Sequence, residues 1–95
     1  MASTDTRHLY PAYPRAFLSI FRRNKNITVD KMATILNISK HYYYSIESGT
    51  RGHNINASLI LRIIEILEVD ALEFLRAEAR YQVERAEFIE LKKKN

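Results

Sequence analysis

The stretch TVDKMATILNISKHYYYSIESG, residues 28–49, constrains the fold more than any other part of the chain. Thr28 and Ser39 are residue types that favour the N-cap of a helix. Asn37, between them, is the commonest non-glycine residue type to accept the left-handed geometry of a sharp turn. We therefore expect one short helix that ends near Leu36 and a second over about 40–47, in a helix-turn-helix pattern.

Helices are also expected on both sides of this stretch. After Pro14, apolar residues at helical spacing predict a helix from Arg15 to the polar run at 24–26. Downstream, Asn56 and Asp70 are again N-cap residue types. No glycine or proline follows Asp70, so the last helix is expected to run almost to the C-terminus. Since no segment alternates like a strand, the sequence predicts an all-α fold.

Composition narrows the class of protein. Ninety-five residues make one domain, and the absence of cysteine excludes a disulfide scaffold and a thiolate metal site. No signal peptide and no membrane span is indicated, so a cytoplasmic protein is expected. The three histidines, His8, His41 and His53, follow no metalloprotease motif, and no glycine-rich loop could bind a nucleotide phosphate. We expect neither an enzyme nor a bound cofactor or metal.

Charge is distributed unevenly. Residues 1–53 contain eight Lys and Arg against three Asp and Glu, whereas residues 54–95 contain seven against eight. The basic first half is suited to a polyanion such as nucleic acid, and the second half to protein contacts.

Residues 28–49 resemble the central motif of the Cro and phage-repressor family, also called XRE. The matching positions are Thr28, Met32, Ala33, Leu36, Ile38, Ser39, Ile46, Glu47 and Gly49. With the flanking helices, the resemblance covers about residues 15–75. It implies a five-helix lambda-repressor-like helix-turn-helix domain, here with an extended C-terminal helix, and an origin in a phage or mobile element is plausible.

The resemblance also implies an ion pair and shows three departures. An arginine late in the family's first helix pairs with the glutamate that closes the third, and Arg22 and Glu47 occupy those places. Val29 stands where the family often has a phosphate-binding glutamine, Asn37 replaces its turn glycine, and Tyr43 replaces a core aliphatic. We expect Tyr43 to point inward, between two surface tyrosines.

In this family the third helix enters the DNA major groove, so its exposed face is expected to contact bases. The candidates on that helix are Lys40, His41, Tyr42, Tyr44 and Ser45. Backbone phosphates are the expected partners of a second group, in helix 2, the loop after helix 3 and the end of helix 1. These candidates are Arg51, His53, Asn54, Arg23, Lys25 and Lys31, while Thr28 and Ser39 either only cap their helices or also place a helix start against a phosphate.

The C-terminal helix has apolar residues on two nearly opposite sides. One side can close the domain core, and we expect the rest to form a homodimer, with a tail folded back on its own domain as the alternative. The residues expected at the dimer contact are Phe74, Tyr81, Val83, Phe88, Ile89 and Leu91. A dimer would suit two half-sites about one duplex turn apart.

The expected organisation is a flexible arm at 1–14, a DNA-binding domain at 15–75 and a helical extension at 76–95. The arm is either simply disordered or in contact with a ligand through Arg7 and His8. The expected function is a sequence-specific double-stranded DNA-binding transcriptional regulator, most simply a repressor, although activation stays open. The alternative is a protein-interaction module of antirepressor or antitoxin type, with a protein as its partner.

Overall fold

The computed structural model describes residues 12–51 and 54–93, which form five helices and no strand. The helices are α1 (Ala16–Asn24), α2 (Val29–Leu36), α3 (Lys40–Ser48), α4 (Ala57–Leu67) and α5 (Ala71–Lys93). The predicted all-α architecture with five helices and a long last helix is confirmed. No helix within these ranges is long and apolar enough to cross a membrane.

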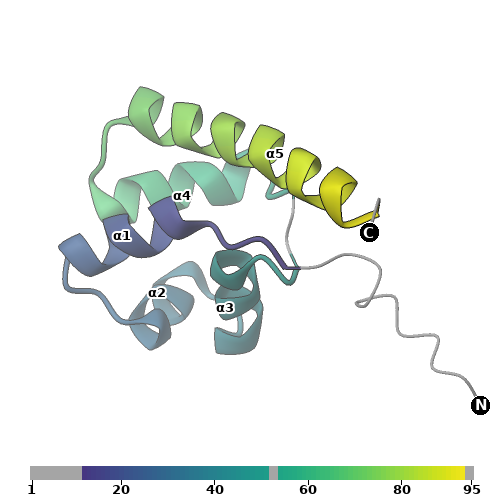
Figure 1. The fold of residues 1–95 in the computed structure, drawn as a ribbon. Coiled ribbons are helices and arrows are strands. Elements are labelled where there is room, and N and C mark those ends of the chain that lie inside the picture. The colour runs from purple at the N-terminus through teal and green to yellow at the C-terminus, as the bar shows by residue number, and fades with distance from the viewer. Residues whose placement is uncertain (1–11, 52–53, 94–95) are drawn as a thin grey trace, which may run out of the picture.

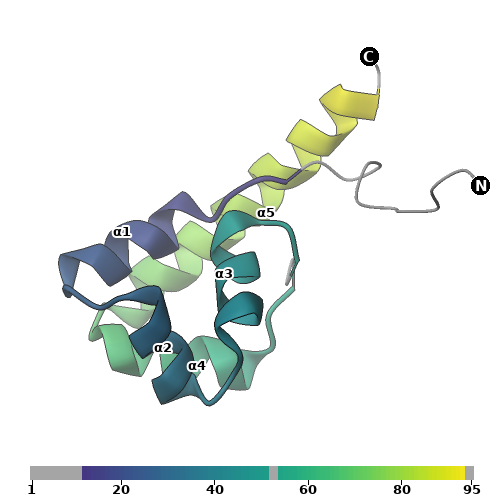
Figure 2. The same ribbon diagram turned by 90° about the horizontal axis from the view of Figure 1, so that it is seen from below.

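The helices are arranged in two groups (Figure 1). α5 runs along one side of the molecule above α1 and α4, and α2 and α3 lie on the other side. Figure 2, seen from below, shows α2 and α3 nearest the viewer and the end of α5 projecting beyond the other helices. The helix-turn-helix pair is therefore presented on the side of the molecule away from α5.

The predicted helix caps are all present. Thr28 Oγ1 accepts the Lys31 backbone N–H at 3.1 Å, and Ser39 Oγ accepts that of Tyr42 at 2.9 Å. The side chains of Asn56 and Asp70 accept backbone N–H groups from the first turns of α4 and α5, both at 2.8 Å. Such bonds satisfy backbone donors that a helix start leaves without partners, so these helix starts are fixed by local sequence.

The turn between α2 and α3 is made by Asn37, which has φ 59° and ψ 43°. Its N–H bonds to the Thr34 carbonyl at 3.1 Å, and the Ile38 N–H bonds to the Ala33 carbonyl at 3.0 Å. This left-handed C-cap reverses the chain within three residues, as the sequence predicted. Asn37 therefore replaces glycine without loss of the turn.

The core lies where all five helices meet. Ten buried apolar residues form one cluster: Leu18, Met32, Ala33, Leu36, Tyr43, Ile46, Ile55, Ile63, Leu67 and Phe74. Ala33 is 3% exposed at the contact between α2 and α3, where a larger side chain would push the two helices apart. Every helix contributes at least one residue to this cluster, and the segment before α4 adds Ile55.

The C-terminal part of α5 has partners within its own chain, which corrects the expectation that it lacks them. The Tyr13 ring lies 5.8 Å from the Tyr81 ring and 5.1 Å from the Phe88 ring, measured between centroids. Tyr81 also donates its hydroxyl to the Tyr13 backbone carbonyl at 2.7 Å. Tyr13 thus lies against α5 and extends the packed part of the chain to the segment before α1.

This packing changes the expected dimer contact. Phe74 is 0%, Tyr81 3% and Ile89 9% exposed, so these three side chains are buried in their own chain and are not available to a second copy. Phe88 is half-buried beside Tyr13. Of the residues expected at the dimer contact, Val83 and Leu91 are well exposed.

The expected division at residues 75 and 76 falls inside α5, which is one continuous helix. Tyr13 and Pro14, placed in the expected arm, precede α1 directly and belong to the packed segment. Arg7 and His8 lie outside the described residues.

Candidate nucleic-acid interface

α3 has one buried face and one exposed face. Tyr43 and Ile46 are fully buried on the inner side, whereas Lys40 and His41 at the start of the helix are exposed. Because Ser39 caps the helix and Asn37 fixes the preceding turn, the N-terminal turn of α3 projects in a defined direction. The helix therefore presents a polar, basic end to solvent.

The three consecutive tyrosines of α3 divide between these faces. Tyr43 is 0% exposed, while Tyr42 is 38% and Tyr44 57% exposed. Successive helical residues are rotated by about 100°, so only one of three can face the core. The buried Tyr43 hydroxyl donates to Glu47 Oε2 at 2.6 Å, and burial is the main cause that raises its pKa.

Glu47 connects α3 to α1. Arg22 donates from Nε to Oε2 at 2.6 Å and from a terminal nitrogen to Oε1 at 3.1 Å, and Ser19 Oγ donates to Oε1 at 2.7 Å. Arg22 also donates to the Ile27 carbonyl at 2.8 Å. Arg22 and Glu47, the pair implied by the family resemblance, are thus in contact, and both are largely buried.

The electrostatics of this cluster favour an ionised Glu47. Burial acts to raise the pKa of Glu47, but hydrogen bonds from Arg22, Tyr43 and Ser19 outweigh it, so the pKa lies below its ordinary value. The bond to Glu47 raises the pKa of Arg22, against the effect of burial. Both groups therefore remain charged at neutral pH, and the cluster fixes the end of α3.

A second connection joins α3 to α5 through Arg15. Its backbone N–H bonds to the Glu47 carbonyl at 2.8 Å, and its guanidinium donates to the Ile46 carbonyl at 3.1 Å. The same guanidinium forms an ion pair with Glu78 and lies 4.5 Å from the centroid of the Tyr81 ring. Sequence reasoning missed this role, because Arg15 looked like an ordinary first residue of a helix.

Arg62 supports α2 in a similar way. From α4 it donates to the Leu36 carbonyl at 2.9 Å and to the Ile35 carbonyl at 2.8 Å. These carbonyls belong to the last turn of α2, where a cation also complements the helix dipole. The orientation of the helix-turn-helix pair is therefore fixed from α1, α4 and α5.

The proposed base-contacting residues do not all face solvent. Ser45 is 3% exposed, and its hydroxyl donates to the Tyr42 carbonyl at 2.7 Å, so it is not available to a base. The prediction for Ser45 is corrected for this reason: it lies on the inner side of α3. Lys40 is exposed, with Nζ 3.1 Å from Asp30 Oδ1 across the turn.

The candidates for phosphate contact differ in whether their side chains are exposed and whether they already have a partner within the chain. Arg51 and Asn54 are exposed after α3, whereas His53 lies outside the described residues. Arg23 is exposed and donates from Nε to the Ser19 carbonyl at 3.3 Å. Lys25 forms an ion pair with Glu68, the C-cap residue of α4, so its amino group already has an anionic partner.

The other candidates of this group lie on α2 and at the two caps. Lys31 is exposed on α2, and Val29 is partly buried. Thr28 and Ser39 use their side-chain oxygens as caps. Among the described residues, then, the exposed groups that lie together on α3 are Lys40, His41, Tyr42 and Tyr44.

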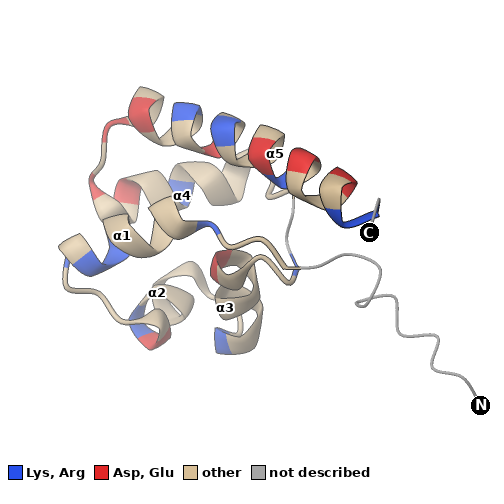
Figure 3. Ribbon diagram, viewed as in Figure 1, with Lys and Arg blue, Asp and Glu red and all other residues tan. Residues whose placement is uncertain are grey.

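The two groups of helices differ in their acidic residues (Figure 3). Acidic and basic residues alternate along α5, whereas α2 and α3 contain few acidic residues. Of those few, Glu47 is buried and paired with Arg22. The side formed by α2 and α3 therefore presents little negative charge to an anionic partner.

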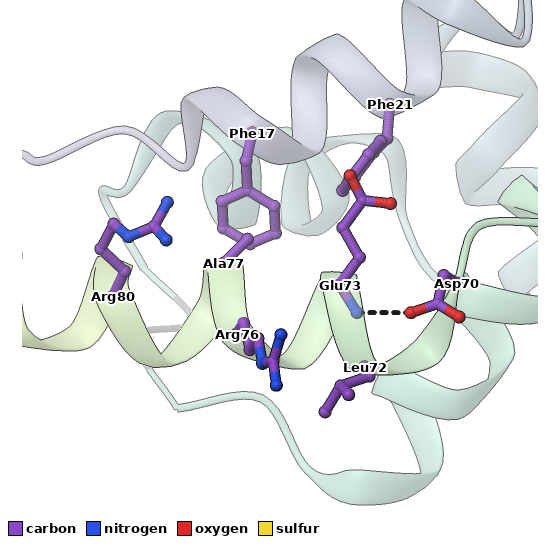
Figure 4. A pocket seen from close by; sticks show the side chains of 8 residues that line it. All are labelled: Phe17, Phe21, Asp70, Leu72, Glu73, Arg76, Ala77 and Arg80. Atoms are coloured by element: carbon purple, nitrogen blue, oxygen red, sulfur yellow. Dashed lines mark hydrogen bonds between the residues drawn. The ribbon is translucent and has the colours of Figure 1, made fainter.

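A groove of about 420 Å³ lies between α1 and α5 (Figure 4). Phe17, Phe21 and Ala77 contribute its apolar lining, and Asp70, Leu72, Glu73, Arg76 and Arg80 line it along α5. Within the described part of the chain, no three His, Cys, Asp or Glu side chains cluster as a metal site would require. The groove is also on a different side from the exposed face of α3.

Comparison with known proteins agrees with this geometry. A family described as "Helix-turn-helix domain" matches residues 16–80. The chain therefore belongs to the helix-turn-helix domain family, and this membership supports DNA as a partner. No curated protein and no solved structure matches the chain.

Proposed function

We propose that this protein is a sequence-specific double-stranded DNA-binding regulator of transcription that inserts α3 into the major groove. The observation that carries the proposal is the exposed end of α3, where Lys40, His41, Tyr42 and Tyr44 project from a helix whose opposite face is fixed by buried contacts. A rigid helix that presents polar side chains can contact base edges in a fixed register.

Each exposed side chain of α3 has a chemistry suited to DNA. Lys40 can donate to guanine O6 and N7, and His41 can donate or accept. Tyr42 and Tyr44 can contact a thymine methyl or donate to a phosphate. Arg51, Asn54, Arg23 and Lys31 are our proposed contacts to the backbone, with Thr28 and Ser39 able to contribute only through the helix starts that they cap.

The simplest action of such a protein is repression, in which a bound copy blocks access to a promoter. We propose that it acts as a homodimer through α5 and that it works in the cytoplasm, where bacterial or phage DNA is found. An origin in a phage or mobile element is part of this proposal.

The experiment is selection of bound duplexes from a random pool, followed by affinity measurements on the enriched duplex at two salt concentrations. Phosphate contacts release counterions, so affinity should fall steeply with salt. Lys40→Ala should lower affinity for the enriched duplex by roughly 5- to 150-fold, which corresponds to about 1–3 kcal/mol for one base contact. Lys92→Ala, a matched change at the far end of α5, should leave it unchanged.

Absence of any duplex binding at low salt would contradict the proposal. In that case the exposed end of α3 would be a protein-binding surface, as in an antirepressor or antitoxin. Equal losses for Lys40→Ala and Lys92→Ala would contradict the assignment of α3 alone, because they would indicate binding by net charge only.

A further inference from the structure

The outer side of α5 presents apolar side chains that no other part of the described chain covers. Leu72 is 54%, Leu75 46% and Val83 59% exposed, and Ala79 and Ala86 are exposed between and beyond them. At about 100° per residue these five positions fall within a sector of roughly 80°. We call these residues the outer stripe: Leu72, Leu75, Ala79, Val83 and Ala86.

The outer stripe is separate from the face of α5 that packs on the core. Phe74, Glu78 and Tyr81 are buried on that inner face. Because the inner face already has its partners, the outer stripe is an additional apolar surface and not a displaced part of the core. Three large aliphatic side chains on one side of a charged helix give an apolar surface that is suited to a protein contact.

The two ends of this surface differ in charge. At the C-terminal end, Ala86, Glu87, Glu90 and Leu91 line a shallow, open hollow with two carboxylates, of which Glu90 Oε1 lies 4.0 Å from Lys93 Nζ. At the N-terminal end, Leu72 is followed by the exposed Arg76. Among the described residues, neither Arg76 nor Glu87 forms an ion pair with another side chain. Within the described ranges, one end thus presents the Arg76 guanidinium and the other a hollow whose anionic group without an ion pair is Glu87.

We propose that the outer stripe binds the outer stripe of a second copy of this chain in antiparallel orientation. A two-fold axis on the outer side of α5, at the level of Tyr81 along the helix, sets the N-terminal end of each helix against the C-terminal end of the other. Leu72 and Arg76 of each copy then lie across from the anionic hollow of its partner, and the complementary contact is made twice.

Side-chain sizes match in the same register. With the axis near Tyr81, Leu75 lies opposite Ala86 of the second copy, and Ala79 lies opposite Val83 of the second copy. Large side chains thus meet small ones, which lets two helices pack closely. The pairing of Arg76 with Glu87 of the second copy is centred near the same level of the helix. The apolar and the charged contacts therefore favour the same register.

A parallel pairing would be less favourable. Its two-fold axis would run along the helices, which puts Arg76 and Glu87 of one copy on the flank opposite to those of the second copy, so the Arg76–Glu87 pair could not form. Parallel pairing would also place Val83 against Val83 and Ala79 against Ala79, so that bulky and small layers alternate. The antiparallel arrangement is therefore the one that the residues of α5 favour.

This inference deepens the proposed homodimer by giving its surface and orientation, but it does not depend on DNA binding. α5 lies on the side of the molecule away from α2 and α3 (Figure 1), so pairing through the outer stripe leaves α3 uncovered. The dimer should therefore form without DNA, and its failure can be told apart from a failure of DNA binding.

The first test is the mass of the full chain in solution by sedimentation velocity. We expect a dimer at tens of micromolar, a shift to monomer for Leu75→Glu, and no shift for Leu61→Glu. Leu61 is a matched control because it is 56% exposed on α4, outside the outer stripe. Circular dichroism should show unchanged helix content in both variants, since both positions are exposed.

Charge reversal tests the pairing of Arg76 with Glu87. Arg76→Glu and Glu87→Arg should each weaken the dimer, and the double variant should restore it, because the pair is re-formed with opposite polarity. A double variant as weak as the single ones would overturn this pairing.

Cysteine pairing tests the orientation, and the chain has no natural cysteine to interfere. Leu75→Cys mixed with Ala86→Cys should form a disulfide-linked heterodimer, while each variant alone should cross-link poorly. A parallel dimer would give the reverse result. A monomeric wild-type chain at these concentrations, or efficient cross-linking of each variant with itself, would overturn the proposal.

Discussion

Arg15 and Glu78, which are 63 positions apart in the sequence, form a buried ion pair with two hydrogen bonds. Arg15 Nε donates to Glu78 Oε1 at 2.9 Å and a terminal nitrogen donates to Oε2 at 3.0 Å. The side chain of Arg15 is fully buried, and it also donates to the Ile46 carbonyl at 3.1 Å. The pair therefore joins α5 to the C-terminal end of α3.

Removal of Arg15 should strongly destabilise the fold. Arg15→Ala leaves the Glu78 carboxylate buried without its cation, which typically costs about 3–5 kcal/mol. Arg23→Ala, at an exposed arginine of α1, the helix that follows Arg15, should change the free energy of unfolding by less than about 0.5 kcal/mol. Urea denaturation of both variants and the wild type measures the difference.

A second variant separates lost charge pairing from lost packing. Arg15→Leu combined with Glu78→Leu removes both charges and fills the site with apolar side chains. It should be more stable than Arg15→Ala, since no buried charge is left alone. If the double variant is the less stable of the two, an unpaired Glu78 carboxylate is not the cause of the loss in Arg15→Ala.

Gly49 allows the segment before α1 to approach the end of α3. Its φ is +77°, and a Cβ at this position would lie 1.9 Å from the Tyr13 carbonyl oxygen. Gly49→Ala should therefore cost more than the roughly 1–2 kcal/mol of left-handed geometry alone, because the backbone at Tyr13 must also move. Asn37→Ala, a left-handed position in the other turn, is the comparison in thermal unfolding. A smaller loss for Gly49→Ala than for Asn37→Ala would contradict this account.

The helix starts and the turn of residues 28–49 were predictable because they depend on local chemistry. Thr28, Ser39 and Asn37 each satisfy or reverse the backbone within a few residues of themselves. The inward position of Tyr43 followed from its place in the family pattern. Short-range patterns of this kind decide where helices begin and end, and they need no knowledge of distant segments.

Contacts between distant segments were not predictable in the same way. Nothing near Arg15 in the sequence indicates that it meets Glu78, and Tyr13 looked like part of a loose arm. Ser45 followed the DNA-facing positions of the family, but its small side chain turns inward and bonds its own helix. The sequence showed two apolar sides on α5. Which of them packs on the core depends on contacts with residues 12–17, which are distant in the sequence.

Acid should weaken the fold through Glu47. The pKa of Glu47 is lower in the folded chain than its ordinary value of 4.5, so the unfolded state binds more protons in this range. The stabilisation is therefore fully present above about pH 4.5 and is lost as pH falls through the folded-state pKa. Urea denaturation between pH 3 and pH 7 should show this loss.

Glu47→Gln tests the assignment. The amide cannot titrate, so the variant should be less stable at neutral pH and should lose less stability than the wild type on acidification. Glu68→Gln is the control, because Glu68 is an exposed carboxylate whose pKa is also lowered, by its hydrogen bond with Lys25. An unchanged acid response in Glu47→Gln would show that other carboxylates cause it.

The three tyrosines of α3 should separate stability from DNA affinity. Tyr43 is fully buried and donates to Glu47, so Tyr43→Ala should cost about 3–5 kcal/mol of stability, as for a large aromatic core residue. Tyr43→Phe should cost about 1–3 kcal/mol, since Glu47 loses one donor. Tyr42→Ala and Tyr44→Ala remove exposed rings and should unfold at nearly the wild-type temperature, yet bind the selected duplex more weakly. Thermal unfolding and duplex titration of the same four variants check this division. It is wrong if Tyr42→Ala loses stability and keeps full affinity, because Tyr42 would then belong to the core and not to the DNA-binding surface.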